Sequence, residues 1–286
     1  MIISVASGKG GTGKTTVAVN LALSLDKKLQ FLDCDVEEPN AHLFLKPTIE
    51  KIEPSFIKVP KIDESLCNLC GRCSSICEYN ALAVIPKTEK IAGRVMVFQQ
   101  LCHGCGGCML LCPQKAITEV DRKIGVVEIG RHKDIQFIHG KIDISEPMAP
   151  PLIRHVKKYI DKDGLTISDC PPGTSCPVVT SVKGSDFCIL VTEPTPFGLH
   201  DLSLAVELLR KINIKFAIAL NKSGPTDKII DDYCKKENIS ILIRIPFDKK
   251  IASAYSKGEN IVEVFPEYKN DFKDLFNKII SIVKKQ

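Results

Sequence analysis

Nine residues near the start of the chain have the types and spacing of a loop that binds phosphate. They are Gly8, Lys9, Gly10, Gly11, Thr12, Gly13, Lys14, Thr15 and Thr16. Glycines let backbone N–H groups close around phosphate oxygens, and the start of a following helix adds partial positive charge. Lys14 is then placed to reach the β- and γ-phosphates, and the Thr15 hydroxyl to hold Mg²⁺. The alternative, a glycine-rich turn with two solvated lysines, fits this spacing poorly.

Three aspartates follow short apolar runs in the same chain. Asp33 and Asp35 follow the run 29–33, and Asp169 follows the run 165–168. Carboxylates at the carboxyl edge of a buried parallel strand suit Mg²⁺ and its water ligands, and an acidic residue at a strand end is the Walker-B position. The alternative is that Asp33 and Asp35 are solvated loop aspartates and that Asp169 begins a capped, proline-rich turn.

Eight of the 13 cysteines form two runs with the spacing Cys-x2-Cys-x2-Cys-x3-Cys. This is the bacterial ferredoxin spacing for a pair of [4Fe–4S] clusters, in which the fourth cysteine of each run ligates the other cluster. The first cluster would use Cys67, Cys70, Cys73 and Cys112, and the second would use Cys77, Cys102, Cys105 and Cys108. Zinc is a weaker alternative, because structural zinc sites usually take cysteines as separated pairs. Glu78 stands where ferredoxins usually have proline.

The elements that must position these residues alternate between strands and helices. Apolar runs predict strands over 1–6, 29–33, 125–129, 135–139, 165–168, 187–191, 216–220 and 241–245, and helical spacing predicts helices over 16–25, 152–160 and 272–283. We therefore expect an α/β fold with a mostly parallel, doubly wound sheet. In the last helix the apolar face is read as core rather than as a membrane contact.

Composition divides the chain into three segments. Residues 1–56 and 121–286 carry the α/β pattern, and the cysteine-rich stretch 57–120 is expected to be a small inserted α+β ferredoxin domain. Lys+Arg 39 against Asp+Glu 34 gives a net charge of +5 with no basic block, so a nucleic acid partner is not expected. No signal peptide or bilayer-length apolar run is visible, so we expect a cytoplasmic protein that does not insert in a membrane.

Several motifs together resemble the MinD/Mrp/ParA class of P-loop ATPases, which includes the nitrogenase iron protein. They are the loop with its early Lys9, the Asp-x-Asp of 33–35 followed by Pro39-Asn40, the Asp-x-Pro-Pro-Gly of 169–173 and the stretch 192–202. The resemblance implies that Lys9 crosses a dimer interface to the partner's nucleotide. It also implies an Mg²⁺ role for Asp33 and Asp169, a water-activating role for Asp35, γ-phosphate sensing by the Gly173 N–H, adenine reading by Asn221, and a base-pocket wall that includes Pro246.

The same resemblance implies ATP, Mg²⁺ and a homodimer in the ATP state, with slow, partner-stimulated hydrolysis. Beside a two-cluster ferredoxin, it favours nucleotide-gated electron transfer to a redox client. Two alternatives stay open: an iron–sulfur assembly or carrier ATPase of the Mrp type, and a positioning ATPase like MinD. The late Cys-x2-Cys pair of Mrp-type carriers is absent. Cys176 lies a short way past Asp169, in the region where the nitrogenase iron protein has a cluster-bridging cysteine, but no other residue supports a third cluster.

Overall fold

The computed structural model describes residues 1–284 and divides into two units. The first contains Met1–Glu53, Val127–Lys141 and the chain from Ile153 to the end of the described residues. The second contains Pro54–Val126 and Ile142–Leu152. The stretch 57–120 thus lies within the second unit. This unit also contains residues 54–56, 121–126 and 142–152, which lie outside the expected insert.

A nine-stranded sheet is the main element of the fold. Its strands are β1 (Ile2–Ser7), β2 (Leu29–Asp33), β3 (Thr48–Ile62), β6 (Ile117–His132), β7 (Ile135–Ile142), β8 (Thr166–Pro172), β9 (Phe187–Thr192), β10 (Phe216–Ser223) and β11 (Ile241–Pro246). Their order is β11-β10-β9-β1-β8-β2-β7-β6-β3, and the pairs from β11 to β7 are all parallel. Because the strand order reverses at β1, its carboxyl end is the expected place for a ligand. The predicted α/β, mostly parallel, doubly wound sheet is confirmed.

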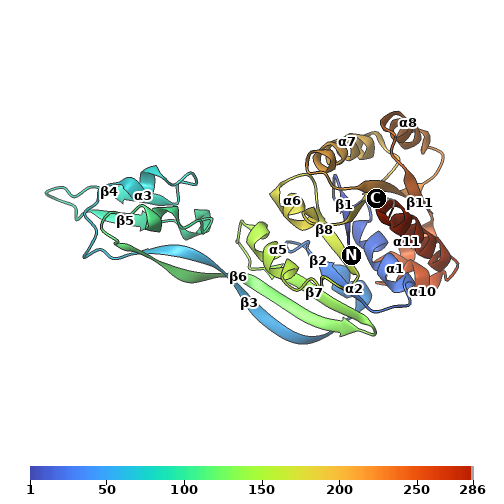
Figure 1. Ribbon diagram of the computed structural model, residues 1–286, viewed down its shortest axis with the longest axis horizontal. Helices are drawn as coiled ribbons and strands as arrows, with labels where there is room; N and C mark the ends of the chain where they lie inside the picture. Colours follow the sequence, from blue (N-terminus) through green and yellow to red (C-terminus); the bar gives the residue numbers. More distant parts are fainter. Residues whose placement is uncertain (285–286) are drawn as a thin grey trace. The chain divides into compact units, whose positions relative to one another are not determined.

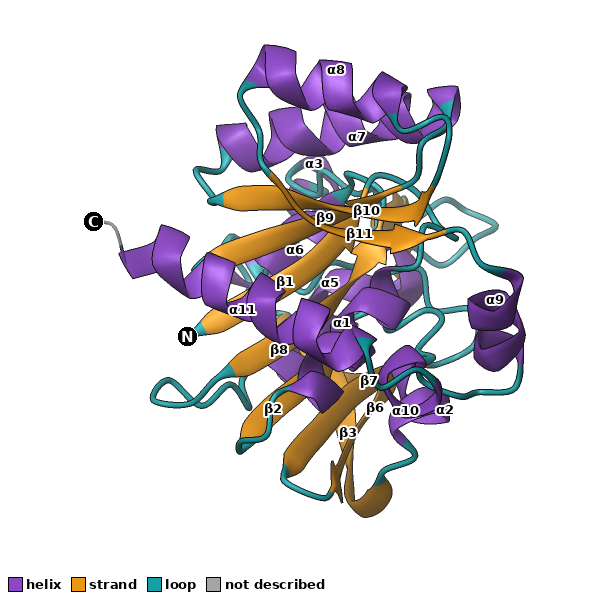
Figure 2. Cartoon of the chain, turned by 90° about the vertical axis from the view of Figure 1, so that its right-hand side faces the viewer, coloured by secondary structure: helices purple, strands orange, loops and turns teal. Residues whose placement is uncertain are grey.

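Helices cover both faces of this sheet. They are α1 (Lys14–Ser24), α2 (Ala41–Leu45), α5 (Ala149–Lys157), α6 (Cys176–Val182), α7 (Pro196–Lys211), α8 (Lys228–Glu237), α9 (Lys249–Ser256), α10 (Ile261–Val264) and α11 (Tyr268–Lys284). Figure 2 shows α7 and α8 on one face and α1 and α11 on the other. In β9, Phe187, Ile189 and Val191 pack in the α1–α11 core, whereas Cys188 and Leu190 pack in the α7–α8 core. Both faces of the strand are therefore apolar, as expected of a buried parallel strand.

The last helix packs into the core as predicted. Phe272, Leu275, Phe276 and Ile279 are buried in the same core as α1. Among residues 1–284, no helix is long and apolar enough to cross a membrane.

Two strands differ from the prediction. The strand expected over 125–129 lies in the second half of the 16-residue β6, and the 15-residue β3 was not predicted at all. The first five residues of β3 are exposed, and Pro54 and Pro60 lie within it. Proline and an exposed start both argue against a strand at the sequence level, and the position of β3 at the edge of the sheet explains why it tolerates both.

The second unit has an internal repeat built on the two cysteine runs. It contains the antiparallel pair β4 (Leu82–Ile85) and β5 (Arg94–Val97), the short helices α3 (Arg72–Ser75) and α4 (Gly107–Leu110), and the 3-10 helix η1 (Gln99–Leu101). Figure 1 shows α3 beside β4 and β5. Gly71 and Gly106 each follow the second cysteine of a run and precede a short helix. Their φ values are 79° and 73°. Each run therefore turns sharply at an equivalent point.

Candidate functional site

The predicted phosphate loop joins β1 to α1, and it requires glycine at several positions. Gly11 and Gly13 have φ values of 77° and 94°, which favour glycine. A Cβ on Gly13 would lie 2.2 Å from Asn221 Nδ2, and one on Gly8 would lie 2.1 Å from the carbonyl oxygen of Asp201. The loop therefore packs directly against the end of β10 and the first turns of α7, and larger side chains at Gly8 or Gly13 would displace it.

Lys14 and Thr15 open the first turn of α1, and both are buried. The Thr15 hydroxyl donates a 2.5 Å hydrogen bond to Asp169 Oδ2. The other oxygen, Asp169 Oδ1, is buried and has no hydrogen-bond partner among residues 1–284. An unpaired buried carboxylate oxygen beside a threonine hydroxyl is a donor set that Mg²⁺ prefers, so these residues fit an Mg²⁺–nucleotide site.

Asp33 lies beside Asp169 at the same edge of the sheet. The two are Cα partners in the parallel pair β2–β8. Asp33 Oδ1 accepts a hydrogen bond of 3.0 Å from Asp35 N, and its Oδ2 accepts bonds of 3.2 and 3.1 Å from Asn40 N and Ala41 N. Burial raises the pKa of Asp33 well above its ordinary value, and the charge of Asp169 raises it further. Burial also raises the pKa of Asp169 to about 6. A nearby divalent cation would relieve the repulsion between these two carboxylates.

Asp35 lies two residues beyond the strand end and is partly buried. Burial raises its pKa to about 6, while the charge of Lys14 opposes this rise. A carboxylate with a pKa close to the working pH is suited to accept a proton from water.

Gly173, the last residue of the Asp-x-Pro-Pro-Gly segment, forms a hydrogen bond within the protein. Gly173 has a φ of 96°, and its N–H donates a 2.9 Å hydrogen bond to the Ser7 carbonyl oxygen. A contact from this N–H to a γ-phosphate, as predicted, requires it to leave Ser7.

An open cavity of about 750 Å³, a volume that includes the space at its mouth, lies beside the loop. It is lined by Gly11, Gly13, Thr16, Asn221, Lys222, Pro246, Phe247, Asp248, Ile251, Ala252 and Tyr255. Asn221 Nδ2 donates a 2.8 Å hydrogen bond to the Thr12 carbonyl oxygen, so the predicted base-reading side chain also ties β10 to the loop. Pro246 is one of the residues that line this cavity. Phe247 and Tyr255 add aromatic surface on which a base can stack.

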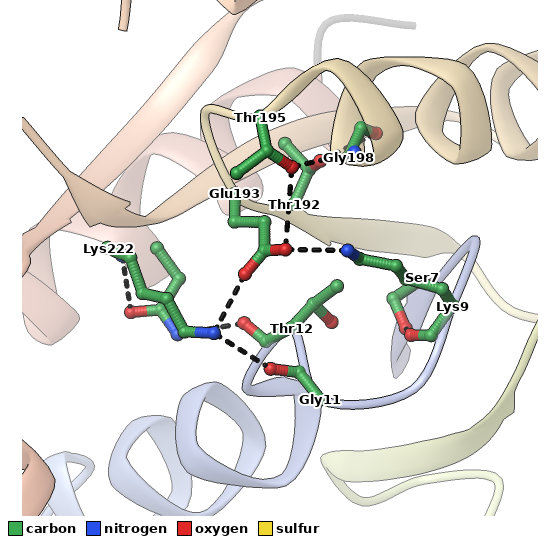
Figure 3. A network of polar contacts seen from close by, with 10 residues as sticks. Ser7, Lys9, Gly11, Thr12, Thr192, Glu193, Thr195, Gly198 and Lys222 are labelled. Atoms are coloured by element: carbon green, nitrogen blue, oxygen red, sulfur yellow. Dashed lines mark hydrogen bonds and ion pairs between the residues drawn. The ribbon is translucent and has the colours of Figure 1, made fainter. Parts of the chain in front are cut away.

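Lys9 does not extend into solvent as a lone side chain. Its Nζ lies 2.6 Å from Glu193 Oε1, and Lys222 Nζ lies 2.7 Å from Glu193 Oε2 (Figure 3). Sequence reasoning assigned no role to Glu193 or Lys222. The available signal was an acidic residue directly after a buried strand, the same signal that identified Asp33 and Asp169.

The eight clustered cysteines line two cavities in the second unit, four to each. One cavity is lined by Cys67, Cys70, Cys73 and Cys112. The other is lined by Cys77, Cys102, Cys105 and Cys108. Each set combines three cysteines of one run with the last cysteine of the other, which is the crossed arrangement that the spacing predicts.

Backbone geometry around the cysteines is repeated between the two halves. Ala81 N donates to Cys77 Sγ at 3.2 Å, and Ala116 N donates to Cys112 Sγ at 3.3 Å, each four residues after the last cysteine of its run. Such N–H···S contacts stabilise thiolates that ligate iron. Gly107 does not have the positive φ of Gly71, Gly104 and Gly106, because it starts α4.

Within residues 1–284, no three His, Cys, Asp or Glu side chains converge on a point where a single metal ion could bind. A cubane cluster makes a different demand, since each of its four thiolates binds a different iron at a separate corner. Four cysteines spread around one cavity match that demand.

The remaining five cysteines do not join either set. Cys34, Cys170, Cys188 and Cys234 are buried in the first unit, whereas Cys176 is exposed at the start of α6. Burial raises the pKa of the Cys34 thiol to about 12 and that of Cys234 to about 11. These two buried thiols therefore stay protonated at neutral pH and behave as small core residues.

Comparison with known proteins gives matches that span most of the chain. A model of the CobQ/CobB/MinD/ParA nucleotide-binding domain matches residues 3–261. An uncharacterized protein of Methanocaldococcus jannaschii is 31% identical over 291 residues, which cover 98% of each chain. An iron-sulfur cluster carrier protein of Pyrococcus horikoshii is 26% identical over 309 residues, covering 99% of this chain and 86% of that protein.

Among solved structures, the septum site-determining protein MinD complexed with Mg-ADP from Pyrococcus horikoshii is similar across the whole chain. The TM-score is 0.61 with 20% sequence identity, and the match covers 100% of this chain and 99% of that one. At this identity the likeness concerns the fold.

Proposed function

Because this chain belongs to the CobQ/CobB/MinD/ParA nucleotide-binding family and is a P-loop ATPase of the MinD/ParA type, we propose that its nucleotide state gates electron transfer from a two-cluster iron–sulfur domain to a partner protein. The observation that carries the proposal is the crossed set of cysteines around each of two cavities in the second unit. The ferredoxin-type domain is assigned to 57–120.

The nucleotide side of the proposal uses the residues at the carboxyl edge of the sheet. The loop from Gly8 to Thr16 holds the phosphates, with Lys14 at the β- and γ-phosphates and Thr15, Asp33 and Asp169 in the Mg²⁺ shell. Asp35 orients and deprotonates the attacking water. Asn221 and Pro246 bind the base, and the Gly173 N–H exchanges Ser7 for the γ-phosphate. Lys9 acts on the partner subunit's nucleotide in an ATP-dependent homodimer, and hydrolysis is slow until a partner stimulates it.

The iron–sulfur side uses the eight cysteines as permanent ligands. A bound [4Fe–4S] cluster accepts and donates single electrons at a potential set by hydrogen bonds and solvent exposure. Here the cysteines hold each cluster from both halves of the repeat, and backbone N–H groups of Ala81 and Ala116 support the fourth thiolate of each set. A set of four protein ligands per cluster favours retention over transfer.

A second candidate function is iron–sulfur cluster delivery. It is favoured by the name of the Pyrococcus horikoshii relative, an iron-sulfur cluster carrier protein. The chain lacks the late Cys-x2-Cys pair of Mrp-type carriers, so delivery would have to draw on the eight clustered cysteines or on Cys176. The two functions differ in whether the iron stays with the chain.

The experiment that separates them starts from anaerobically purified protein. The reduced protein is mixed with an apo-ferredoxin acceptor in the presence of ATP, and both proteins are separated and analysed for iron and sulfide. Retained iron together with nucleotide-dependent reduction of a one-electron acceptor supports the redox function. Iron that moves stoichiometrically to the apo-acceptor replaces it with delivery, and stoichiometric zinc without visible absorbance overturns both.

A further inference from the structure

Glu193 binds two lysines at once, one from the phosphate loop and one from the base pocket. Lys9 Nζ donates to Oε1 at 2.6 Å, and Lys222 Nζ donates to Oε2 at 2.7 Å (Figure 3). Lys222 Nζ also donates to the Gly11 carbonyl oxygen at 3.2 Å. The side chain of Glu193 is only 12% exposed, whereas those of Lys9 and Lys222 are 30% and 43% exposed. The carboxylate is therefore fixed and buried, and the lysines reach it from the surface.

The turn that carries Glu193 is held rigidly. Thr195 caps α7, because its hydroxyl oxygen accepts a 2.9 Å hydrogen bond from Gly198 N. The Thr192 hydroxyl donates to the Gly198 carbonyl oxygen at 3.1 Å. A Cβ on Gly198 would lie 2.3 Å from the Glu193 carbonyl oxygen, so the turn leaves no room for a larger residue. Because this turn fixes the backbone of Glu193, the carboxylate can follow a departing lysine only as far as its own side chain reaches.

Resting on the proposed function, in which Lys9 must reach a partner subunit, we propose that Lys222 is a positioning residue that sets how readily Lys9 leaves Glu193. A buried carboxylate that loses its only cation bears a large desolvation cost. With Lys222 still bound to Oε2, the carboxylate keeps one cation when Lys9 departs. Lys222 thereby makes the departure of Lys9 easier than it would be from a simple ion pair.

Charge on Glu193 is consistent with this arrangement. Burial alone raises the pKa of this carboxyl, but hydrogen bonds from Lys222 and Lys9 bring it below its ordinary value. The group therefore stays ionised at neutral pH and always needs at least one of the two lysines. Removal of Lys222 should leave Lys9 as the one cation among these partners, beside the Thr195 hydroxyl at 3.5 Å from Oε1, and so hold Lys9 more tightly. Neutralising Glu193 should release Lys9.

The test measures the reactivity of the Lys9 amine in nucleotide-free protein, by competitive acylation followed by peptide mass spectrometry. Glu193→Gln should raise the acylation of Lys9 by about three- to tenfold, the range expected from loss of a partly buried ion pair. Lys222→Gln should lower it, and Lys222→Arg, which keeps a cation, should restore the wild-type value. The double variant Glu193→Gln/Lys222→Gln should match Glu193→Gln alone, because Lys222 acts through Glu193.

A matched control is Lys211→Gln, which removes an ion-paired lysine at 2.7 Å from Glu207 on α7 and should leave Lys9 unchanged. Circular dichroism of each variant checks that neither the higher nor the lower acylation of Lys9 comes from misfolding. Equal Lys9 reactivity in wild type, Glu193→Gln and Lys222→Gln overturns the inference.

Dimer formation with a non-hydrolysable ATP analogue is measured on the same samples. It should strengthen in Glu193→Gln and weaken in Lys222→Gln. If the acylation pattern holds but the wild type forms no nucleotide-dependent dimer, the proposed trans role of Lys9 is wrong, while the control of Lys9 by Lys222 stands.

Discussion

Asp33 and Asp169 stand side by side as Cα partners in β2 and β8, and both carboxyl groups are fully buried. Hydrogen bonds from Asp35 N, Asn40 N and Ala41 N stabilise Asp33, whereas Asp169 keeps one oxygen without a partner among residues 1–284. The two carboxylates therefore repel each other, which lowers the stability of the nucleotide-free fold. A bound cation would relieve this repulsion, which favours Mg²⁺–nucleotide binding.

The first prediction is that Asp169→Asn stabilises the nucleotide-free protein and disables the enzyme. The substitution removes one of two repelling buried carboxylates, so the free energy of unfolding at pH 7.5 should rise by roughly 1–3 kcal/mol, the scale of a one- to two-unit pKa shift. ATP hydrolysis should fall by at least about a hundredfold, the scale of a lost electrostatic group. Denaturant unfolding and a phosphate-release assay measure the two effects. A variant that is less stable than wild type without nucleotide would contradict the repulsion.

A second prediction concerns pH. The pKa of Asp35 is raised to about 6, chiefly by burial, so the hydrolysis rate should fall as the pH drops below about 6. Excess Mg²⁺ should shift this fall in rate to lower pH, because a nearby cation favours the ionised carboxylate. Asp35→Asn should lower the rate and leave only the pH dependence of the remaining acidic groups, among them Asp169, whose pKa is also raised to about 6.

The same shift has a stability consequence with a defined sign. The folded state binds the Asp35 proton more tightly than the unfolded state, so nucleotide-free stability should decrease as the pH rises from about 4 to about 6. Burial raises the pKa of Asp169 in the same direction, so the contribution of Asp35 is the difference in stability between wild type and Asp35→Asn. A difference that stays flat across this range would show that the pKa of Asp35 is not raised.

A third prediction tests the crossed cysteine sets. Cys112→Ala should remove the same cluster as Cys70→Ala, although the two cysteines belong to different runs. Likewise, Cys77→Ala should remove the same cluster as Cys105→Ala. Each variant should retain about four of about eight irons, and the electron paramagnetic resonance spectrum of the surviving cluster should be shared within each pair.

The control for the cysteine series is Cys176→Ala, since this exposed cysteine lies in neither cavity. It should keep all the iron. Spectra that group by run rather than across runs would refute the crossed ligation.

A fourth prediction separates the two loop lysines. Lys14→Ala should impair nucleotide binding and hydrolysis at its own site, whereas Lys9→Ala should spare most binding and stop hydrolysis. A mixture of the two variants should regain activity, because each mixed dimer has one subunit with Lys14 and a partner with Lys9. Titration of one variant into the other measures the recovery. The absence of any recovery, with a monomer at all ATP concentrations, would argue that Lys9 acts within its own chain.

Sequence reasoning succeeded where the local pattern determines the structure. The loop glycines predict a strand–loop–helix joint, and the joint between β1 and α1 is observed; strand-end aspartates predict a shared edge, and Asp33 and Asp169 meet there. In the two cysteine runs, Gly71 and Gly106 stand at equivalent positions, and both have positive φ values. In each case a few neighbouring residues carry the whole signal.

Sequence reasoning failed where the structure depends on contacts between residues that are far apart in the sequence. The edge strand β3 has an exposed first half that no local apolar pattern identifies. The two ion pairs of Glu193 join residues 184 and 29 positions apart in the sequence, and only the folded sheet brings them together. Glutamate and lysine are also common solvated surface residues, so their residue types alone do not predict these ion pairs.

The last prediction concerns coupling between nucleotide and clusters, for which the chain offers a continuous covalent route. Asp33 Oδ2 holds the start of α2 through Asn40 N and Ala41 N, and β3 begins three residues after α2 ends. β3 then runs from Thr48 to Ile62 as one strand, leaving the first unit and entering the second. A change in the cation shell at Asp33 can therefore act on the strand that leads to the first cysteine run.

Coupling of this kind must be reciprocal. If ATP shifts a cluster potential, cluster reduction must shift ATP affinity by the same free energy, for which about 1–3 kcal/mol is typical. For a one-electron couple, about 59 mV corresponds to a tenfold change in an equilibrium constant. We expect redox titrations with ADP and with a non-hydrolysable ATP analogue to differ for at least one cluster, and nucleotide affinities with oxidised and reduced clusters to differ by the matching factor.

The control for this coupling is Lys14→Ala, which should keep both clusters but show no nucleotide-dependent potential, because it binds nucleotide poorly. Potentials that shift in this variant as well would point to a direct effect of the added ions. Potentials and affinities that are equal in all states would remove equilibrium redox coupling. Nucleotide would then have to act by docking the electron acceptor, and the acceptor's affinity, measured with ATP and with ADP, would become the quantity that differs.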